Sequence, residues 1–328
     1  MLLEIDESIP EELMGDEARA DGDVLRRAMQ NIATARVEGK HVVYGSRSTL
    51  SALAECDRLD ERAKATFGRI RSRVAELHSL YRKVVMRVKV VSNGRAEGEL
   101  EEGPNGRNIV VDARQFTDTS FIQPCILLCE HMSDGRYYIL MGRVASDALG
   151  FANVRIAPTI RHGGGGATAA QYGHIQARAK RLCICILDSD KKSEAGGIGG
   201  TARSVRRRND PERPLCQYRL TESREVENLI PTPVISDVSN PGSGRRAAYR
   251  ALRNIERSQY SDRRQYLDVK RGTKLANLFG FAEDSPEADY WKPALRDVAT
   301  NGESYRVRCL NRDECEHVRI AHCRCVVV

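Results

Sequence analysis

Two short apolar runs near the centre of the chain each end abruptly at acidic residues. Cys125–Cys129 reads CILLC and precedes Glu130, and Leu182–Leu187 reads LCICIL and precedes Asp188 and Asp190. A continuous apolar run of this length, closed by polar residues, is typical of a strand buried on both faces of a parallel sheet. Ligands of such sheets bind beyond the carboxyl ends of the strands, so the pattern places these acids where a site is expected.

The surrounding sequence alternates strand-like and helix-like segments. Further strand-like runs cover residues 137–143 and 155–160, and a helix-like segment ending at Arg178 follows four consecutive glycines at 163–166. This alternation predicts an α/β fold with a mostly parallel sheet flanked by helices. The glycines fit a loop that lets an anion approach the next helix, and equally a flexible connection from strand to helix.

The regions on either side have different patterns. Apolar residues at helical spacing within 23–37 and 60–81 predict a largely helical N-terminal region, whereas residues 1–22 are mostly acidic and aperiodic and predict a loosely packed tail. Glycine, asparagine and charged residues at 92–108 predict a loop and a domain boundary. We therefore expect an N-terminal region for partner binding or oligomerisation (1–108), an α/β domain (109–235) and a helical C-terminal extension with a cysteine-rich tail (236–328).

The composition is that of a globular protein, with 41% hydrophobic and 30% charged residues. No apolar stretch approaches the roughly 18 residues that a membrane span requires, and the acidic start MLLEIDESIPEE differs from a signal peptide. We expect a soluble, cytoplasmic protein with no membrane partner. In that compartment a disulfide framework is not expected, and the cysteines within the apolar runs should be small buried residues, namely Cys125, Cys129, Cys183 and Cys185.

Positive charge is concentrated in the later part of the chain. The formal net charge is +7 although the charged residues among the first 25 are nearly all acidic, and arginines cluster at 69–73, 178–181, 203–213 and 245–264. Clustered arginine favours a polyanionic partner such as DNA or RNA, while ordinary solvated helix faces are the alternative explanation. A basic helix is expected from about Gly200 to Arg208, and its candidates for contacts to a phosphodiester backbone are Arg203, Arg206, Arg207 and Arg208.

A third acidic cluster, REVEN, follows at residues 224–228 and contains Glu225 and Glu227. Acidic clusters that converge on one sheet edge repel one another unless cations neutralise them. Carboxylates suit hard cations such as Mg²⁺ or Mn²⁺, and a pair of divalent ions is the usual device of phosphodiester chemistry. The alternative is that Asp188 caps the next helix and Asp190 is solvated.

These acids, in this order, resemble the TOPRIM domain of topoisomerases, bacterial primases and OLD-family nucleases. ILLCEHMSD is similar to its strand–Glu–Gly–x–x–Asp element, with Glu130 and Asp134 at the matching positions. ILDSDKK is similar to its strand–Asp–x–Asp element, with Asp188 and Asp190. One departure is His131, which stands where the family has glycine and narrows the approach of a phosphate.

Two later segments extend the resemblance, which covers roughly residues 121–275. REVENLIP is similar to the later acidic element of TOPRIM nucleases in phage-defence systems, with Glu227 as a ligand and Glu225 as a second one. YLDVKRGT resembles a strand that ends in the catalytic lysine of OLD-like nucleases, and this places the role on Lys270.

The resemblance implies a Mg²⁺- or Mn²⁺-dependent endonuclease acting on DNA or on RNA such as tRNA. It implies catalytic roles for Glu130, Asp188, Asp190, Glu227 and Lys270, and metal-ligand roles for Glu130, Asp134, Asp188, Asp190, Glu225 and Glu227. A TOPRIM protein without a fused ATPase cassette resembles a toxic effector of bacterial antiphage defence, activated by a regulatory or sensor partner such as an ATPase. The alternative is a TOPRIM-like nucleic-acid-binding or regulatory protein without catalysis.

Four more cysteines lie within 17 residues near the C-terminus, together with two histidines. Such density favours a structural Zn²⁺ site formed by Cys309, Cys315, Cys323 and Cys325. The spacing is not that of two C-x-x-C pairs, so reduced cysteines in a buried strand are the alternative.

Overall fold

The computed structural model describes residues 1–15, 21–96, 98–103, 106–237, 253, 255–269, 286–287 and 289–291. The chain divides into two compact units. The first comprises Met1–Ile186 and Ser204–Arg219, and the second comprises Leu187–Arg203 and Leu220–Val328. The chain therefore leaves the first unit after Ile186, returns to it at Ser204 and leaves it again after Arg219.

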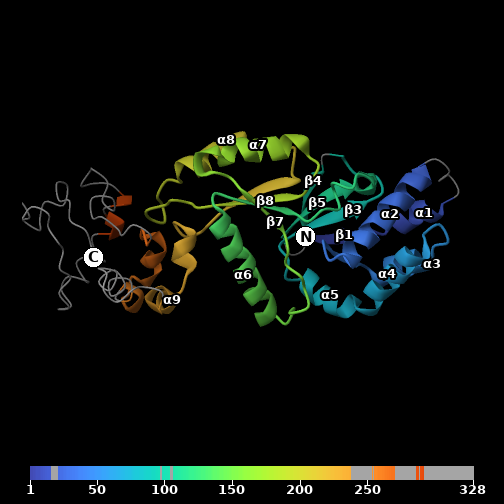
Figure 1. Cartoon of the computed structure of the whole chain (residues 1–328), viewed down its shortest axis with the longest axis horizontal. Helices are drawn as coiled ribbons and strands as arrows, with labels where there is room; N and C mark the ends of the chain where they lie inside the picture. Colours follow the sequence, from blue (N-terminus) through green and yellow to red (C-terminus); the bar gives the residue numbers. More distant parts are fainter. Residues whose placement is uncertain are drawn as a thin grey trace, which may run out of the picture. The chain divides into compact units, whose positions relative to one another are not determined.

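The first unit contains a five-stranded, mostly parallel sheet. In chain order its strands are β1 (Leu2–Ile5), β2 (Val42–Gly45), β3 (Met86–Val91), β4 (Glu99–Gly103) and β5 (Gly106–Asp112). They lie in the order β2-β1-β3-β5-β4, with β4 antiparallel to β5. Strand β1 has parallel neighbours on both sides, because Leu3 is level with Val43 of β2 and with Val88 of β3. Figure 1 shows β1 and β3 of this sheet together with helices α1–α5.

Helices of the same unit accompany this sheet, namely α1 (Ser8–Met14), α2 (Asp21–Val37), α3 (Arg47–Glu55), α4 (Glu61–Ser72) and α5 (Val74–Tyr81). The helices predicted at 23–37 and 60–81 are confirmed, except that the second is interrupted at Arg73. Side chains cap the N-termini of two of these helices, α3 and α4. Ser46 Oγ accepts the Thr49 N–H at 3.0 Å, and Asp60 Oδ1 accepts the Ala63 N–H at 2.7 Å.

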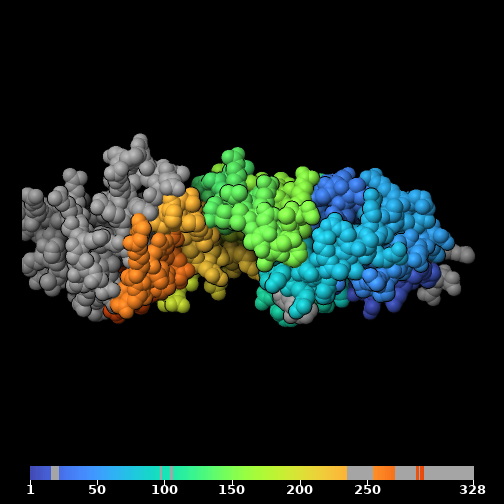
Figure 2. All heavy atoms as spheres, turned by 90° about the horizontal axis from the view of Figure 1, so that it is seen from below, coloured from blue at the N-terminus to red at the C-terminus, as the bar shows by residue number. Residues whose placement is uncertain are grey.

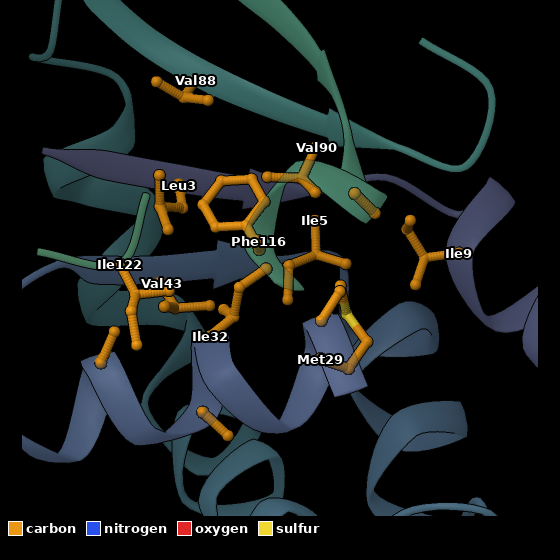
Figure 3. Close-up of a cluster of buried hydrophobic side chains, with 14 of the residues drawn as sticks. Leu3, Ile5, Ile9, Met29, Ile32, Val43, Val88, Val90, Phe116 and Ile122 are labelled. Atoms are coloured by element: carbon orange, nitrogen blue, oxygen red, sulfur yellow. The ribbon is translucent and has the colours of Figure 1, made fainter. Parts of the chain in front are cut away.

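Strands and helices of this unit share one apolar core (Figure 3). Leu3 and Ile5 of β1 and Val90 of β3 lie with Met29 and Ile32 of α2 in this buried cluster. In α2 the apolar side chains recur three or four residues apart, so they face the sheet together. The core therefore depends on side chains from the very first residues of the chain.

Two expectations about the N-terminal region were wrong. The start of the chain is not a loosely packed tail, because it contains β1 and α1 and Leu3 is 0% exposed. Residues 92–108 are not a single loop, because they contain β4 and the start of β5. Helices do form most of the regular structure there, but they pack on a sheet whose first two strands have only four residues each, too few for a recognisable period.

A second sheet consists of β6 (Ile126–Cys129), β7 (Thr159–His162), β8 (Cys183–Leu187) and β9 (Cys216–Leu220), in the order β7-β6-β8-β9. Strand β6 is parallel to both β7 and β8. The connecting segments contain α6 (Met132–Ala148), α7 (Thr168–Arg178) and α8 (Gly200–Arg208). The fold is thus α/β, with mostly parallel sheets flanked by helices, as the alternation predicted.

Residues 137–143, which were expected to form a strand, belong to helix α6 instead. The side of the helix that carries Gly135 and Gly142 lies against the segment leading into β7. An ideal Cβ on Gly135 would be only 2.6 Å from Ile160 Cγ2, and one on Gly142 would be 3.3 Å from Ile156 Cδ1. The apolar run YYILM is too short for its period to separate strand from helix, and tertiary packing decided it.

The remaining described elements are shorter. They are the 3₁₀ helices η1 (Ala113–Thr117), η2 (Gly165–Ala167), η3 (Val226–Leu229) and η4 (Ser261–Tyr266), and the helix α9 (Thr232–Asp237). Among the described residues, no helix combines the length and the apolar character that crossing a membrane would require.

The position of β1 between two parallel neighbours makes a testable prediction about stability. Leu3→Ala should lower the free energy of unfolding by about 2–5 kcal/mol, because it leaves a cavity where β1 meets the helices. The measurement is urea denaturation followed by circular dichroism. Val85→Ala is the matched control, since Val85 is 72% exposed and its truncation should change stability by no more than about 0.5 kcal/mol. Equal, small effects of both changes would contradict the buried position of β1.

Candidate active site

The first unit presents Glu130 at the carboxyl end of β6. Cys129, the last residue of β6, is level with Ile186 of β8 and with His162 of β7. The backbone carbonyl of Glu130 accepts a hydrogen bond from Gly164 at 3.2 Å. The glycine-rich loop after β7 is therefore attached to the backbone at Glu130, and the carboxyl ends of β6 and β7 form one edge.

Asp134 stabilises the turn between Glu130 and helix α6. Its Oδ2 accepts the backbone N–H of His131 at 3.0 Å, and its Oδ1 accepts the hydroxyl of Ser133 at 3.2 Å. Asp134 occupies the third position of α6 and is buried. An acid in the first turn that binds an N–H group at the helix start caps the helix and favours its dipole. Asp134 therefore orients the residue that follows Glu130, whatever its part in metal binding.

Two histidines lie beside each other at this edge. The rings of His131, after β6, and His162, at the end of β7, are 5.6 Å apart between centroids and tilted by 32°. Both side chains are exposed. His131 was expected as a departure from the family pattern, but His162 was not singled out. The parallel pairing of β6 with β7 brings the two histidines together. No local sequence signal identifies the pair, because the two residues are far apart in the chain.

The buried thiol of Cys185 lies close enough to Glu130 to interact with it electrostatically. Burial chiefly raises the pKa of the Cys185 thiol, and the neighbouring Cys216, Cys129 and Glu130 raise it further. The thiol therefore stays protonated at neutral pH. The expectation of small buried cysteines in the apolar runs is confirmed for Cys125, Cys129, Cys183 and Cys185.

In the second unit, Asp188 follows β8 directly and binds a distant segment. Its Oδ1 accepts the backbone N–H of Val226, the first residue of η3, at 3.0 Å. The alternative that Asp188 caps a helix is therefore partly correct, but the helix is η3, 38 residues away, and not the next one along the chain. This bond connects the Asp188 segment to the acidic segment around Glu225 and Glu227.

Ser189, between the two aspartates, makes three hydrogen bonds to residues outside its own turn. Its N–H donates to Thr221 Oγ1 at 3.0 Å, and its hydroxyl donates to the Ser223 carbonyl at 2.6 Å. Its carbonyl accepts the Gly199 N–H at 2.8 Å. Ser189 is buried, so these bonds are shielded from water. Sequence reasoning did not assign Ser189 a role, because a serine in a polar turn carries no distinguishing signal.

Asp190 adopts a left-handed backbone conformation, with φ of 54°. Its N–H donates to the Arg224 carbonyl at 2.9 Å. Gly199 lies directly against its side chain, since an ideal Cβ on Gly199 would be 1.9 Å from Asp190 Oδ2. The position of the Asp190 carboxylate thus requires a glycine at residue 199.

The acidic segment at 224–228 contains a positively charged side chain, that of Arg224. Arg224 Nε is 3.4 Å from Glu225 Oε1, and Arg224 Nη2 is 3.2 Å from Asp268 Oδ2. All three side chains are nearly buried, with 11–12% of each exposed. Asn228 joins the same region by donating to the carbonyl of Leu267 at 2.9 Å. Asp268 is an acid that sequence reasoning did not select.

Helix α8 presents a row of arginines. Ala202 and Val205 are buried, whereas the side chains of four arginines are exposed. These are Arg203, Arg206, Arg207 and Arg208, the residues expected to contact a nucleic-acid backbone. The predicted basic helix is confirmed with the same boundaries, while its ligand stays a prediction.

Other expected site residues lie outside the described part of the chain. These are Lys270, Cys309, Cys315, Cys323 and Cys325. The strand expected before Lys270 is not found, because Tyr266 ends the 3₁₀ helix η4 and residues 267–269 are irregular. Among the described residues, no three His, Cys, Asp or Glu side chains form a group with metal-ligand geometry. The proposed metal site therefore stays a prediction.

Comparisons with protein-family models, with curated proteins and with solved structures each found no match.

The contact between Gly199 and Asp190 is testable. Gly199→Ala should lower the free energy of unfolding by about 1–3 kcal/mol in urea denaturation, because the new methyl group overlaps the Asp190 carboxylate. Gly200→Ala is the matched control, because a Cβ at residue 200 meets open space. The control should be neutral or slightly stabilising. If both changes were neutral, Asp190 would not be held against residue 199.

Proposed function

We propose that this protein is a metal-dependent nuclease that hydrolyses phosphodiester bonds in DNA or RNA. The observation that carries the proposal is the register of β6 and β8. Cys129 is level with Ile186, Glu130 follows Cys129, and Asp188 follows Ile186 by two residues. Parallel strands deliver the residues after them to the same edge of a sheet, where ligands of such folds bind.

The proposed donors fit a hard divalent cation. Glu130, Asp188, Asp190 and Glu227 offer only carboxylate oxygens, which suit Mg²⁺ and Mn²⁺. Such ions, when bound, activate water for attack and stabilise the leaving oxygen. Asp188 keeps its orientation through the Val226 N–H, and Asp190 keeps its position through the Ser189 turn.

Positive side chains would bind the substrate backbone. The four exposed arginines of α8 are candidates for contacts to phosphates, because contacts of this kind hold a nucleic-acid backbone without reading its sequence. Lys270 would neutralise charge that develops on the transferring phosphoryl group, a role that the family resemblance alone supports.

The resemblance also supports a biological setting. We infer a toxic effector of a bacterial antiphage system, held inactive or switched on by a partner protein such as a sensor ATPase. A structural Zn²⁺ at Cys309, Cys315, Cys323 and Cys325 belongs to the same set of proposals.

A nucleic-acid-binding or regulatory protein without catalysis is the second candidate. The observation in its favour is that two of the acids already have structural roles. Asp134 caps α6, and Asp188 caps η3. His131, which stands where the family has glycine, also favours this second candidate, because its side chain occupies space where a phosphate would enter.

Removing one proposed ligand should abolish cleavage without unfolding the protein. Glu130→Gln and Asp188→Asn should each reduce cleavage of plasmid, single-stranded DNA or tRNA by at least about 100-fold in Mg²⁺ or Mn²⁺, because each loses a charged metal ligand. Asn at residue 188 keeps an acceptor for the Val226 N–H, so the fold is preserved. Glu222→Gln, at an exposed acid, should leave cleavage unchanged. Full activity of either ligand variant, or of the wild type in EDTA, would refute the proposal of a metal-dependent nuclease with these ligands.

The arginines of α8 make a separate prediction. Arg206→Ala and Arg207→Ala should weaken nucleic-acid binding and reduce the slope of log affinity against log salt by about 0.9 for each phosphate that the protein no longer neutralises. Fluorescence anisotropy over a salt series measures this slope. Arg62→Ala, at an exposed arginine on α4, should leave the slope unchanged. Salt-sensitive binding by a protein that never cleaves would favour the second candidate.

A further inference from the structure

Helix α6 leaves an apolar stripe uncovered. Leu140 and Val144 are each 54% exposed, on the side opposite to Gly135 and Gly142, which lie against the segment around β7. Of the 17 residues of α6, only Asp134 and Gly135 are buried. The atoms of this helix, coloured green, lie at the surface in Figure 2. Large apolar side chains exposed on one helix face are a feature of interaction surfaces.

The same stripe carries opposite charges at its two ends. Arg136 and Asp147 are exposed and lie in line with Leu140 and Val144, since the four residues are spaced by four, four and three positions. Among the described residues, neither Arg136 nor Asp147 forms an ion pair within the chain. The stripe is thus positive near the start of α6, apolar in the middle and negative near its end.

We propose that α6 is the interface of a homodimer in which the helices of two copies pack antiparallel. When Leu140 of one copy lies opposite Val144 of the other, Arg136 of each copy lies opposite Asp147 of the other to within one residue. A two-fold interface requires that each contact occurs twice with the roles exchanged, and this stripe satisfies that condition. A parallel arrangement would place Arg136 against Arg136, so the charges fix the direction.

Arg143 lies at the rim of the stripe, about one turn from Leu140 on one side and from Asp147 on the other. Its long side chain reaches solvent at the edge of such an interface, with its stem over the apolar centre. The proposal assigns the contact between copies to α6 and not to residues 1–108, and it is independent of the nuclease activity.

Sedimentation velocity of the full chain over a wide concentration range tests the dimer. The wild type should approach the mass of two chains as concentration rises. Arg136→Asp and Asp147→Arg should each raise the dimer dissociation constant by at least about tenfold, because each creates two like-charge contacts across the two-fold axis. Leu140→Asp should do the same by placing charge in the apolar centre.

The double variant Arg136→Asp with Asp147→Arg distinguishes this arrangement from any other. It exchanges the charges across the interface, so it should restore the dimer. Arg62→Asp on α4 is the charge-matched control and should leave the mass unchanged. Circular dichroism checks that each variant is folded. A wild type with the mass of one chain at every concentration would overturn the proposal and would indicate that a different protein binds the stripe. A dimer that the single variants do not weaken, or that the double variant does not restore, would also overturn it.

Discussion

Parallel pairing of β6 with its neighbours is the constraint from which the rest of the candidate site follows. Parallel strands in register end level with one another, so the residues after them are delivered to a common edge. In this chain the residue after β6 is Glu130, and histidine and glycine stand at the end of β7. An ionised carboxylate in a folded protein needs donors, cations or water to compensate its charge.

In the second unit, hydrogen-bond donors and an arginine of the same unit compensate part of the negative charge of its acids. Ser189 binds two segments at once, at residues 221–223 and at Gly199, and Asp188 receives the N–H group at the start of η3. Arg224 lies between the carboxylates of Glu225 and Asp268. Hydrogen bonds and a cation of this kind stabilise ionised carboxylates and fix their directions. Such preorganisation benefits a metal site, and it is equally sufficient for a purely structural turn.

Helix α6 connects the edge to the surface. It begins at Met132, two residues after Glu130, and Asp134 in its first turn accepts the N–H group of the intervening His131. Its glycine-bearing side lies against the segment leading into β7, and its other side displays the stripe of Arg136, Leu140, Val144 and Asp147. A partner on that stripe would therefore bind the same element that orients the end of β6.

The sequence by itself determined the α/β class, the buried runs of β6 and β8, the boundaries of α8 and the burial of the cysteines in those runs. These features depend on local composition and period, which the chain carries residue by residue. Tertiary structure decided that the first residues form a central strand, that YYILM is helical, that Ser189 and Gly199 position the two aspartates, and that His131 and His162 are neighbours. Each of these depends on contacts between residues far apart in the chain, and short segments contain no period or motif that specifies which distant residues will meet.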